Sequence, residues 1–224
     1  MISRQELAEA LRVIVITDAG FAAPRTVEDV VLEVLRAGAR TIQLRDKNAS
    51  ARALFQEALR LRRLTRPWGA LLFINDRLDV ALAAEADGVH VGPHDLPVAG
   101  IRSVVPAGFL IGHSAADPSL ARQAEADGAD YVGCGPVFPT GTKKDAGEVM
   151  GLEGLARVVS SVAIPVVGIG GIGPEGARQI AESSRAAGVA VVSAIMAAGD
   201  PSAAFREISA PFGIARGFPP FPPR

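Results

Sequence analysis

The chain has 224 residues, 49% of them hydrophobic, and a formal net charge of −1. That length and apolar content suffice for one domain with a large core, and the charge balance excludes a generally basic face for nucleic acid. The longest uncharged stretch, residues 158–174, has 17 residues and includes two prolines, whereas a membrane helix needs about 20 predominantly apolar residues. A single cysteine excludes an internal disulfide. We therefore predict a cytoplasmic protein without membrane or nucleic-acid partners; a homo-oligomer is compatible with the sequence.

Helix starts can be read at several points along the chain. Ser3 with Glu6 has the spacing of a capping box and predicts a helix ahead of the first strand, where it could close the bottom of a barrel. Thr26 with Asp29 repeats that spacing before an amphipathic segment. Pro174 fits the first turn of a later helix.

Short, nearly continuous apolar runs separate these helical segments, as expected for parallel strands buried on both faces. The predicted strands are Val13–Thr17, Thr41–Leu44, Ala70–Ile74, Val89–Val91, Leu110–Gly112, Tyr131–Gly133, Pro165–Ile169 and Val189–Val192. Eight strands alternating with eight helical segments favour an α/β fold of the (β/α)8 TIM-barrel type, with an extra N-terminal helix, over a doubly wound sheet. We predict a single barrel domain over residues 1–210 and a loose, proline-rich tail over 211–224.

A glycine recurs where a helical pattern meets an apolar run, at Gly38, Gly88, Gly128 and Gly188. Glycine adopts the left-handed conformation at a helix C-terminus without a Cβ clash. We therefore expect all four to end helices in that conformation.

Polar residues follow the apolar runs, and in a parallel barrel all strand C-termini meet on one face, which carries the active site. Gly170-Gly171 follows the seventh run and Val192-Ser193 the eighth. Loops at these two positions commonly bind phosphate, because glycine exposes backbone N–H groups next to a helix start. The alternative is that the glycines only form a tight turn.

A second anion site is suggested at the end of the second strand. Gln43, Arg45 and Lys47 alternate and so point the same way, with Leu44 on the opposite face. Two cations and a carboxamide suit a diphosphate. The alternative is an interior ion pair between Arg45 and an acid such as Asp18.

Two aspartates follow neighbouring strands, Asp76 after the third and Asp95 after the fourth. Mg²⁺ typically binds one or two carboxylates and completes its shell with water and phosphate oxygens. These residues therefore indicate a magnesium site beside the diphosphate. Each aspartate could instead cap the helix that follows it.

The long loop after the sixth strand contains Thr140-Gly141-Thr142-Lys143, whose hydroxyls, amide and ammonium could hold a phosphate and close as a lid. A solvated surface loop would have a similar composition. Lys47 and Lys143 raise a Schiff-base aldolase as an alternative, but both lie in polar surroundings that do not depress a lysine pKa. His113 and Ser114 end the fifth strand and are expected to line the pocket, whereas His90 is expected to pack on its strand.

Together these motifs resemble the thiamine-phosphate synthase family over nearly the whole chain. The resemblance rests on motifs in the same order, namely Ile16-Thr17-Asp18, Gln43-Leu44-Arg45-Asp46-Lys47, Asn75-Asp76, Gly88 to Gly92 with Asp95-Leu96-Pro97, Ile111 to Ser114, Gly133 to Phe138, Thr140 to Lys143, Gly168 to Ile172 and Val192-Ser193. The chain departs from the family pattern at Pro93-His94, at His113 and at Ala115-Ala116.

The resemblance implies roles for individual residues. A pyrimidine diphosphate would be held by Gln43, Arg45, Lys47, Asn75, Ser114 and Lys143, of which Arg45, Lys47, Ser114 and Lys143 would act in catalysis. A thiazole phosphate would be held by Thr140, Gly141, Thr142, Gly170, Gly171, Val192 and Ser193. Asp76 and Asp95 would bind Mg²⁺.

The implied reaction is the condensation of hydroxymethylpyrimidine diphosphate with hydroxyethylthiazole phosphate, by dissociative displacement of diphosphate. Two other functions fit the same fold. A thiazole tautomerase-like paralogue would need only the thiazole phosphate site, and a non-catalytic phosphate-ligand sensor would need only the pocket. The group formed by Gln43, Arg45 and Lys47, together with Asp76, favours the synthase.

Overall fold

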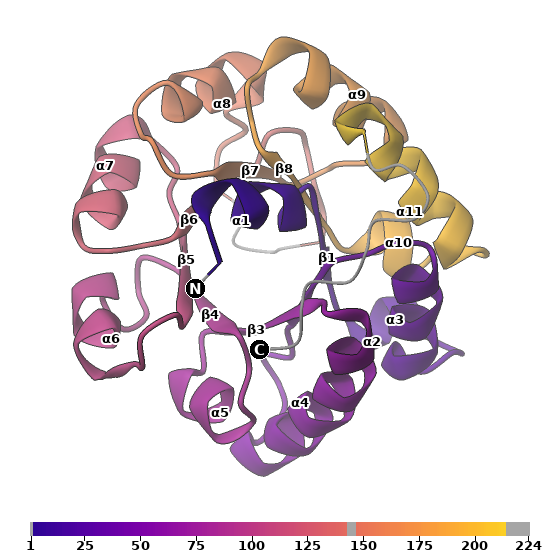
Figure 1. Ribbon diagram of the computed structural model, residues 1–224. Coiled ribbons are helices and arrows are strands. Elements are labelled where there is room, and N and C mark those ends of the chain that lie inside the picture. The colour runs from indigo at the N-terminus through magenta and orange to yellow at the C-terminus, as the bar shows by residue number, and fades with distance from the viewer. Residues whose placement is uncertain (1, 143–146, 214–224) are drawn as a thin grey trace.

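The computed structural model describes residues 2–142 and 147–213, and Figure 1 shows a ring of helices around a central barrel. The barrel is closed, with eight parallel strands in consecutive order. The strands are β1 (Val13–Ile16), β2 (Thr41–Leu44), β3 (Leu71–Asn75), β4 (Gly88–Val91), β5 (Leu110–Ser114), β6 (Tyr131–Cys134), β7 (Val166–Ile169) and β8 (Gly188–Val191). The pairing of β1 with both β2 and β8 closes the sheet. The (β/α)8 prediction is therefore confirmed, and the doubly wound sheet is excluded.

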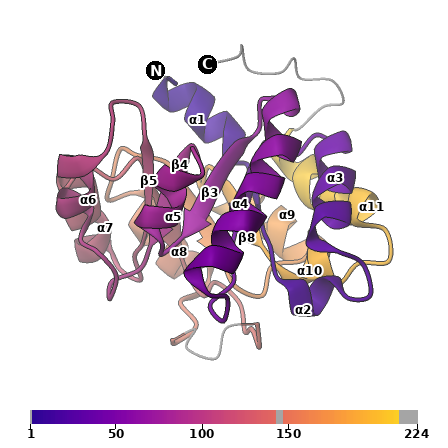
Figure 2. The same cartoon turned by 90° about the horizontal axis from the view of Figure 1, so that it is seen from below.

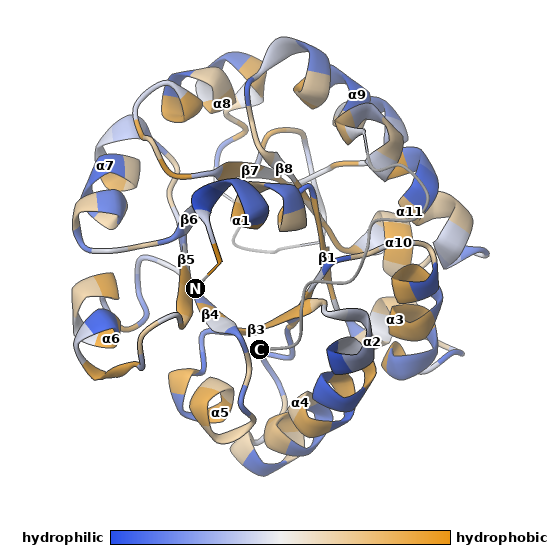
Figure 3. Ribbon diagram, in the orientation of Figure 1, coloured by the Kyte–Doolittle hydropathy of each residue, from blue (hydrophilic) through white to orange (hydrophobic). Residues whose placement is uncertain are grey.

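Helices surround the barrel and turn their apolar faces toward it, as the hydropathy colouring in Figure 3 shows. They are α1 (Arg4–Ala10), α2 (Ala19–Ala22), α3 (Val27–Arg36), α4 (Ala51–Thr65), α5 (Leu78–Ala83), α6 (Val98–Val104), α7 (Pro118–Ala126), α8 (Gly151–Val159), α9 (Pro174–Ser183), α10 (Ser193–Met196) and α11 (Pro201–Ser209), with 3-10 turns η1 (Arg66–Trp68) and η2 (Ala210–Phe212). Both predicted capping boxes form, at Ser3 and Thr26. Pro174 occupies the first turn of α9. No helix in the described ranges is both long and apolar enough to span a bilayer.

The extra N-terminal helix closes one end of the barrel. Leu7, Ala10 and Leu11 belong to the same buried cluster as the residues inside the barrel. Thr41 on β2 donates a hydrogen bond of 2.8 Å from its hydroxyl to the carbonyl oxygen of Ala10. Figure 2 shows α1 at one end of the barrel and the described residues that follow β6 and precede α8 at the other. The C-terminal ends of the strands therefore lie at the end away from α1 (Figure 2).

The predicted tail is described only in its first residues. Residues 211–213 continue from α11 through η2, and Phe212 packs against the main core cluster. The Arg12 guanidinium lies 3.4 Å from the carbonyl oxygen of Gly213. These contacts attach residues 211–213 to the barrel, and residues 214–224 lie outside the described ranges.

The four recurring glycines have two different roles. Gly38 and Gly128 have φ of 106° and 97°, so they adopt the expected left-handed conformation. The same expectation is wrong for Gly88 and Gly188, which are the first residues of β4 and β8. A Cβ at Gly88 would lie 2.4 Å from the Leu110 carbonyl oxygen, and one at Gly188 would lie 2.3 Å from that of Leu11. Close backbone approach, rather than dihedral freedom, requires glycine at these two sites.

Gly88→Ala should destabilise the barrel by about 3 kcal/mol, because the added methyl must displace backbone in a packed interior. Gly199→Ala is the matched control, since a Cβ there meets nothing within 4 Å. The control should change the free energy of unfolding by less than about 0.5 kcal/mol. Urea denaturation of both variants measures the difference, and equal stabilities would contradict the role given to Gly88.

Candidate active site

Two cavities lie at the end of the barrel away from α1. The larger has a volume of about 440 Å³ and is lined by the loops that follow the strands. The smaller, of about 30 Å³, lies among side chains from inside the barrel, including Gln43, Arg45 and Tyr131. Asn75, His90, Ser114 and Thr142 line both cavities, among other shared residues. The two cavities therefore form one site with an inner and an outer part.

The alternating residues at the end of β2 contribute to both parts of this site. Gln43 is buried, and together with Arg45 it lines the inner cavity, while Lys47 lines the outer one. Leu44 faces the opposite way, into the core between barrel and helices. The predicted arrangement of these side chains is confirmed.

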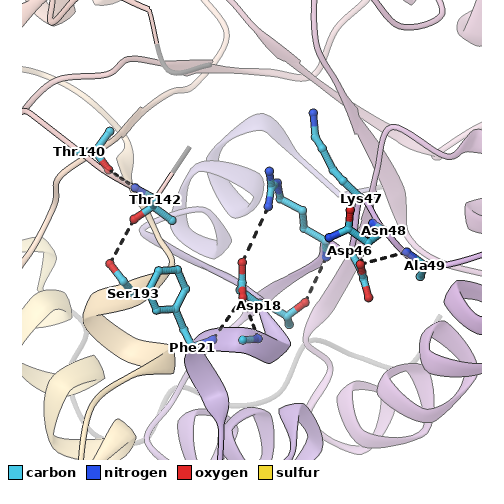
Figure 4. A network of polar contacts seen from close by, with 12 residues as sticks. Asp18, Phe21, Asp46, Lys47, Asn48, Ala49, Thr140, Thr142 and Ser193 are labelled. Carbon is cyan, nitrogen blue, oxygen red and sulfur yellow. Dashed lines mark hydrogen bonds and ion pairs between the residues drawn. The ribbon is translucent and has the colours of Figure 1, made fainter. Parts of the chain in front are cut away.

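Arg45 also makes the interior ion pair foreseen as an alternative. Its guanidinium lies 4.0 Å from the carboxylate of Asp18. Asp18 in turn caps α2 by accepting hydrogen bonds from the backbone N–H groups of Gly20 and Phe21 (Figure 4). The Nε of Arg45 is buried and has no hydrogen-bond partner in the described residues. An unsatisfied buried donor is costly, so this atom is suited to an acceptor brought by an anionic ligand.

One prediction for Asp76 was that it caps the helix that follows it, but Asp76 does not cap that helix, α5. Its backbone has φ of 63°, a left-handed value uncommon outside glycine, and the N-cap position of α5 belongs to Arg77. The Asp76 carboxylate lines the outer cavity and lies 3.7 Å from the ammonium of Lys47. Strained backbone of this kind is concentrated at functional sites.

Asp95 lines the same outer cavity and does not cap α6, whose N-cap is Pro97. Its carboxylate accepts a 2.7 Å hydrogen bond from the backbone N–H of Gly92. Within the described ranges, no group of three or more His, Cys, Asp or Glu residues could hold a metal ion. Two carboxylates lining a cavity beside a cation suit a hard ion that takes its other ligands from water and phosphate oxygens.

The opposite wall of the cavity is formed by the loops after β6, β7 and β8. The hydroxyls of Thr142 and Ser193 lie 3.4 Å apart, and the hydroxyl of Thr140 accepts a hydrogen bond of 3.2 Å from the backbone N–H of Thr142 (Figure 4). Val192 lines the cavity beside Ser193. Hydroxyls from two distant loops thus face one region of the site.

Gly170 and Gly171 have φ of 97° and 66°, and both line the outer cavity. A Cβ at Gly171 would lie 2.4 Å from the Pro139 carbonyl oxygen. The two glycines therefore form the tight turn that was predicted as an alternative to phosphate binding. They also bring the loops after β6 and β7 into contact. Gly141 is exposed and is not among the residues that line either cavity, and Lys143 lies outside the described ranges.

Two of the residues that line the site were not predicted from the sequence. His90 was expected only to pack on its strand, yet it lines both cavities and lies 2.9 Å from Ser114 Oγ through Nε2. Tyr131, fully buried, lies 2.9 Å from His90 Nδ1 through its hydroxyl. The available signal was the alternation on β4, where His90 shares its face with Gly88 and Gly92.

The expectation that His113 lines the pocket is not supported, because His113 is absent from the lining of both cavities. It alternates with Ser114 on β5 and so points out of the barrel. Burial lowers the pKa of His113, and the charges of Asp127 and Asp95 partly oppose this shift. His94 does line the outer cavity. Cys134 is buried beside Met150, and burial raises the pKa of its thiol to about 12, so the thiol is not a nucleophile.

Cations, carboxylates and hydroxyls at the C-terminal end of a (β/α)8 barrel define the class of barrels that bind phosphorylated small molecules. The family model described as thiamine monophosphate synthase matches residues 13–195. The chain belongs to this family.

Relatives agree with this assignment over nearly their whole length. A thiamine-phosphate synthase from Archaeoglobus fulgidus is 48% identical over 202 residues, covering 90% of this chain and 93% of the relative. One from Chloroflexus aurantiacus is 48% identical over 199 residues, covering 89% and 91%. The structure of thiamine phosphate pyrophosphorylase from Pyrococcus furiosus superimposes with a TM-score of 0.85 at 43% identity, covering 94% of this chain and all of that one. A 3-hexulose-6-phosphate synthase, with a TM-score of 0.66 at 18% identity, shares the fold.

Proposed function

We propose that the protein is a thiamine-phosphate synthase, a transferase that joins hydroxymethylpyrimidine diphosphate to hydroxyethylthiazole phosphate and releases pyrophosphate. The observation that carries the proposal is one cavity with two different anion-binding walls. One wall has Lys47, Asp76 and Asp95, and the other has Thr142 and Ser193. A substrate pair with a diphosphate and a phosphate requires both walls.

The diphosphate belongs on the wall formed by β2 to β5. Arg45 and Lys47 would neutralise its charge, and the buried Nε of Arg45 would gain an acceptor. Asn75 and Ser114, which line both cavities, and Gln43, which lines the inner one, add uncharged hydrogen-bonding groups. By its family resemblance, Lys143 joins this set. Fixed charges in a site of this kind stabilise a departing anion without reorganising.

Asp76 and Asp95 would hold a magnesium ion, because their carboxylates line one cavity next to the diphosphate wall. The bound ion would neutralise negative charge on the diphosphate oxygens. Lys47, 3.7 Å from Asp76, would keep that carboxylate oriented and share the same diphosphate. The residues present therefore fit the metal.

The thiazole phosphate belongs on the opposite wall, where Gly170 and Gly171 can offer backbone N–H groups, and Thr140, Thr142 and Ser193 their hydroxyls. In the reaction, the bond between the pyrimidine methylene and the diphosphate oxygen breaks, and both electrons leave with pyrophosphate. The lone pair of the thiazole nitrogen then forms the new carbon–nitrogen bond. No side chain has to take a proton, which fits a site whose only lining histidines are His90 and His94 in the described ranges.

Mixing the purified protein with both substrates and Mg²⁺ should yield thiamine phosphate and pyrophosphate in equal amounts. Excess EDTA should reduce the rate by at least about a hundredfold, since the ion contributes several kcal/mol to charge stabilisation. Chromatography of the product and a coupled pyrophosphate assay measure both. Binding of thiazole phosphate without release of pyrophosphate would favour the tautomerase-like or sensor alternatives.

The cellular location and the oligomeric state stay predictions of the sequence. The proposed substrates are small phosphorylated molecules, for which a cytoplasmic enzyme is expected. The one cysteine, Cys134, is buried, so the fold needs no oxidising compartment.

A further inference from the structure

Three polar side chains from three strands, Tyr131, His90 and Ser114, form a chain of hydrogen bonds inside the barrel. Gln43 on β2 and Tyr131 on β6 line the inner cavity together, and the Gln43 carboxamide is close enough to influence the Tyr131 hydroxyl. That hydroxyl lies 2.9 Å from His90 Nδ1 on β4, and His90 Nε2 lies 2.9 Å from Ser114 Oγ on β5. The chain runs from the buried centre of the barrel to the wall of the ligand cavity.

Glycines on β5 and β6 make room for these rings and hold them in place. A Cβ at Gly112 would lie 2.2 Å from the Tyr131 ring and 2.5 Å from His90 Nδ1. One at Gly133 would lie 3.1 Å from His90 Cε1. Phe73 also packs edge-on against the Tyr131 ring, with centroids 5.4 Å apart. The rings therefore fill defined spaces, and their hydrogen bonds have a fixed geometry.

Which atom donates in each of these hydrogen bonds follows from counting the protons of the three side chains. Burial raises the pKa of Tyr131, so its hydroxyl keeps its single proton. The neighbouring Gln43 carboxamide opposes that shift, as expected if its N–H group is turned toward the hydroxyl oxygen. The Tyr131 proton is then available for His90 Nδ1. A neutral imidazole that accepts at Nδ1 carries its proton on Nε2 and donates it to Ser114 Oγ. His90 is the only described partner of Ser114 Oγ, so the Ser114 proton is left to point into the cavity.

We propose that Gln43, Tyr131 and His90 fix the Ser114 hydroxyl as a hydrogen-bond donor toward the cavity, where it binds an anionic oxygen of the diphosphate. His90 and Tyr131 are positioning residues in this scheme, because they act through Ser114. The assignment of the diphosphate as the ligand rests on the proposed function, whereas the donor direction of the hydrogen bonds does not. The reverse direction would turn Ser114 into an acceptor and repel the same oxygen.

The tautomer of His90 tests the direction without any assay of activity. At pH 8, ¹⁵N NMR of histidine-labelled protein distinguishes the protonated from the unprotonated ring nitrogen. With 3 histidines in the chain, the spectrum of His90→Gln identifies the signals of His90. We expect the proton on Nε2. A proton on Nδ1, or on both nitrogens, would overturn the proposal.

Variants at His90 test the consequence for Ser114. The amide of glutamine can replace Nε2 as the donor to Ser114, whereas the shorter asparagine reaches only toward Tyr131. His90→Asn should weaken the binding of inorganic pyrophosphate with Mg²⁺ by about tenfold, as for one lost hydrogen bond to a charged group. His90→Gln should restore it to within about threefold. Equal affinities in the two variants would overturn the proposal.

Tyr131→Phe and Phe73→Leu form a matched pair for separating positioning from packing. Tyr131→Phe removes the proton that selects the His90 tautomer, so the KM for the pyrimidine diphosphate should rise about fivefold while that for the thiazole phosphate stays constant. Phe73→Leu disturbs the same packing but keeps the Tyr131 hydroxyl, so it should lower thermal stability and change the KM for the pyrimidine diphosphate by less than Tyr131→Phe does. A Tyr131→Phe enzyme with unchanged KM values would count against the proposal. If the protein binds pyrophosphate as described but makes no thiamine phosphate, the proposed function fails and the chain of hydrogen bonds stands.

Discussion

Asp76→Asn should slow the release of pyrophosphate by about a thousandfold, the upper range for loss of one electrostatic group at a reacting centre. Asparagine keeps the volume of the side chain and tolerates the left-handed backbone at φ 63°. Alanine would add backbone strain to the lost charge, so asparagine is the sharper test. The change removes the negative charge that pairs with Lys47 and is proposed to hold Mg²⁺. A coupled pyrophosphate assay measures the rate.

Binding of thiazole phosphate, measured by calorimetry, should be unaffected by Asp76→Asn because that ligand lies on the opposite wall. Asp79→Asn is the matched control. Asp79 pairs with Arg77 on the surface, its side chain is 65% exposed, and it lines neither cavity. The Asp79→Asn enzyme should retain normal turnover. Equal damage to turnover and to thiazole phosphate binding in Asp76→Asn would argue against the metal role.

Gly171→Ala should raise the KM for the thiazole phosphate by about a hundredfold, the cost expected when binding groups shift by about 1 Å. A methyl at Gly171 would lie 2.4 Å from the Pro139 carbonyl oxygen and would be strained at φ 66°. The loops after β6 and β7 would have to separate, and Thr140 and Thr142 would move with the first of them. Steady-state kinetics with each substrate varied in turn measures the change.

Gly173→Ala, two residues further on, is the control for Gly171→Ala. A Cβ at Gly173 meets nothing within 4 Å, and its φ of −116° suits any residue. Kinetics and unfolding of this variant should stay close to those of the original protein. A Gly171→Ala enzyme with an unchanged KM would show that the contact between the two loops does not shape the phosphate site.

The sequence allowed the barrel to be predicted because its signals are local. Each strand is a short apolar run, and helix starts such as Ser3 and Thr26 have capping residues at fixed spacing. The group of Gln43, Arg45 and Lys47 was equally accessible, because alternation along a single strand decides which side chains share a face. The family resemblance added roles to these residues.

The relation between His90 and Tyr131 could not be predicted in this way. It depends on which strands face each other across the barrel and on the absence of side chains at Gly112 and Gly133, neither of which is a local property. Asp76 illustrates a second limit. Its position before a helix suggested a cap, but a left-handed backbone turns it toward Lys47 instead.

The helix α1 covers the far end of the barrel (Figure 2), so within the described ranges the site opens toward the loops that follow the strands. Both reactants must come in, and both products must go out, by the same route. The inner cavity beside Gln43 and Arg45 shares its lining with the outer one, so a group that reaches into it is covered by a ligand in the outer cavity. That group has to enter before the covering ligand, and pyrophosphate left beside Arg45 has to depart after the joined product. With the diphosphate beside Arg45, the pyrimidine compound arrives first, and this order of entry follows from the architecture rather than from any moving part.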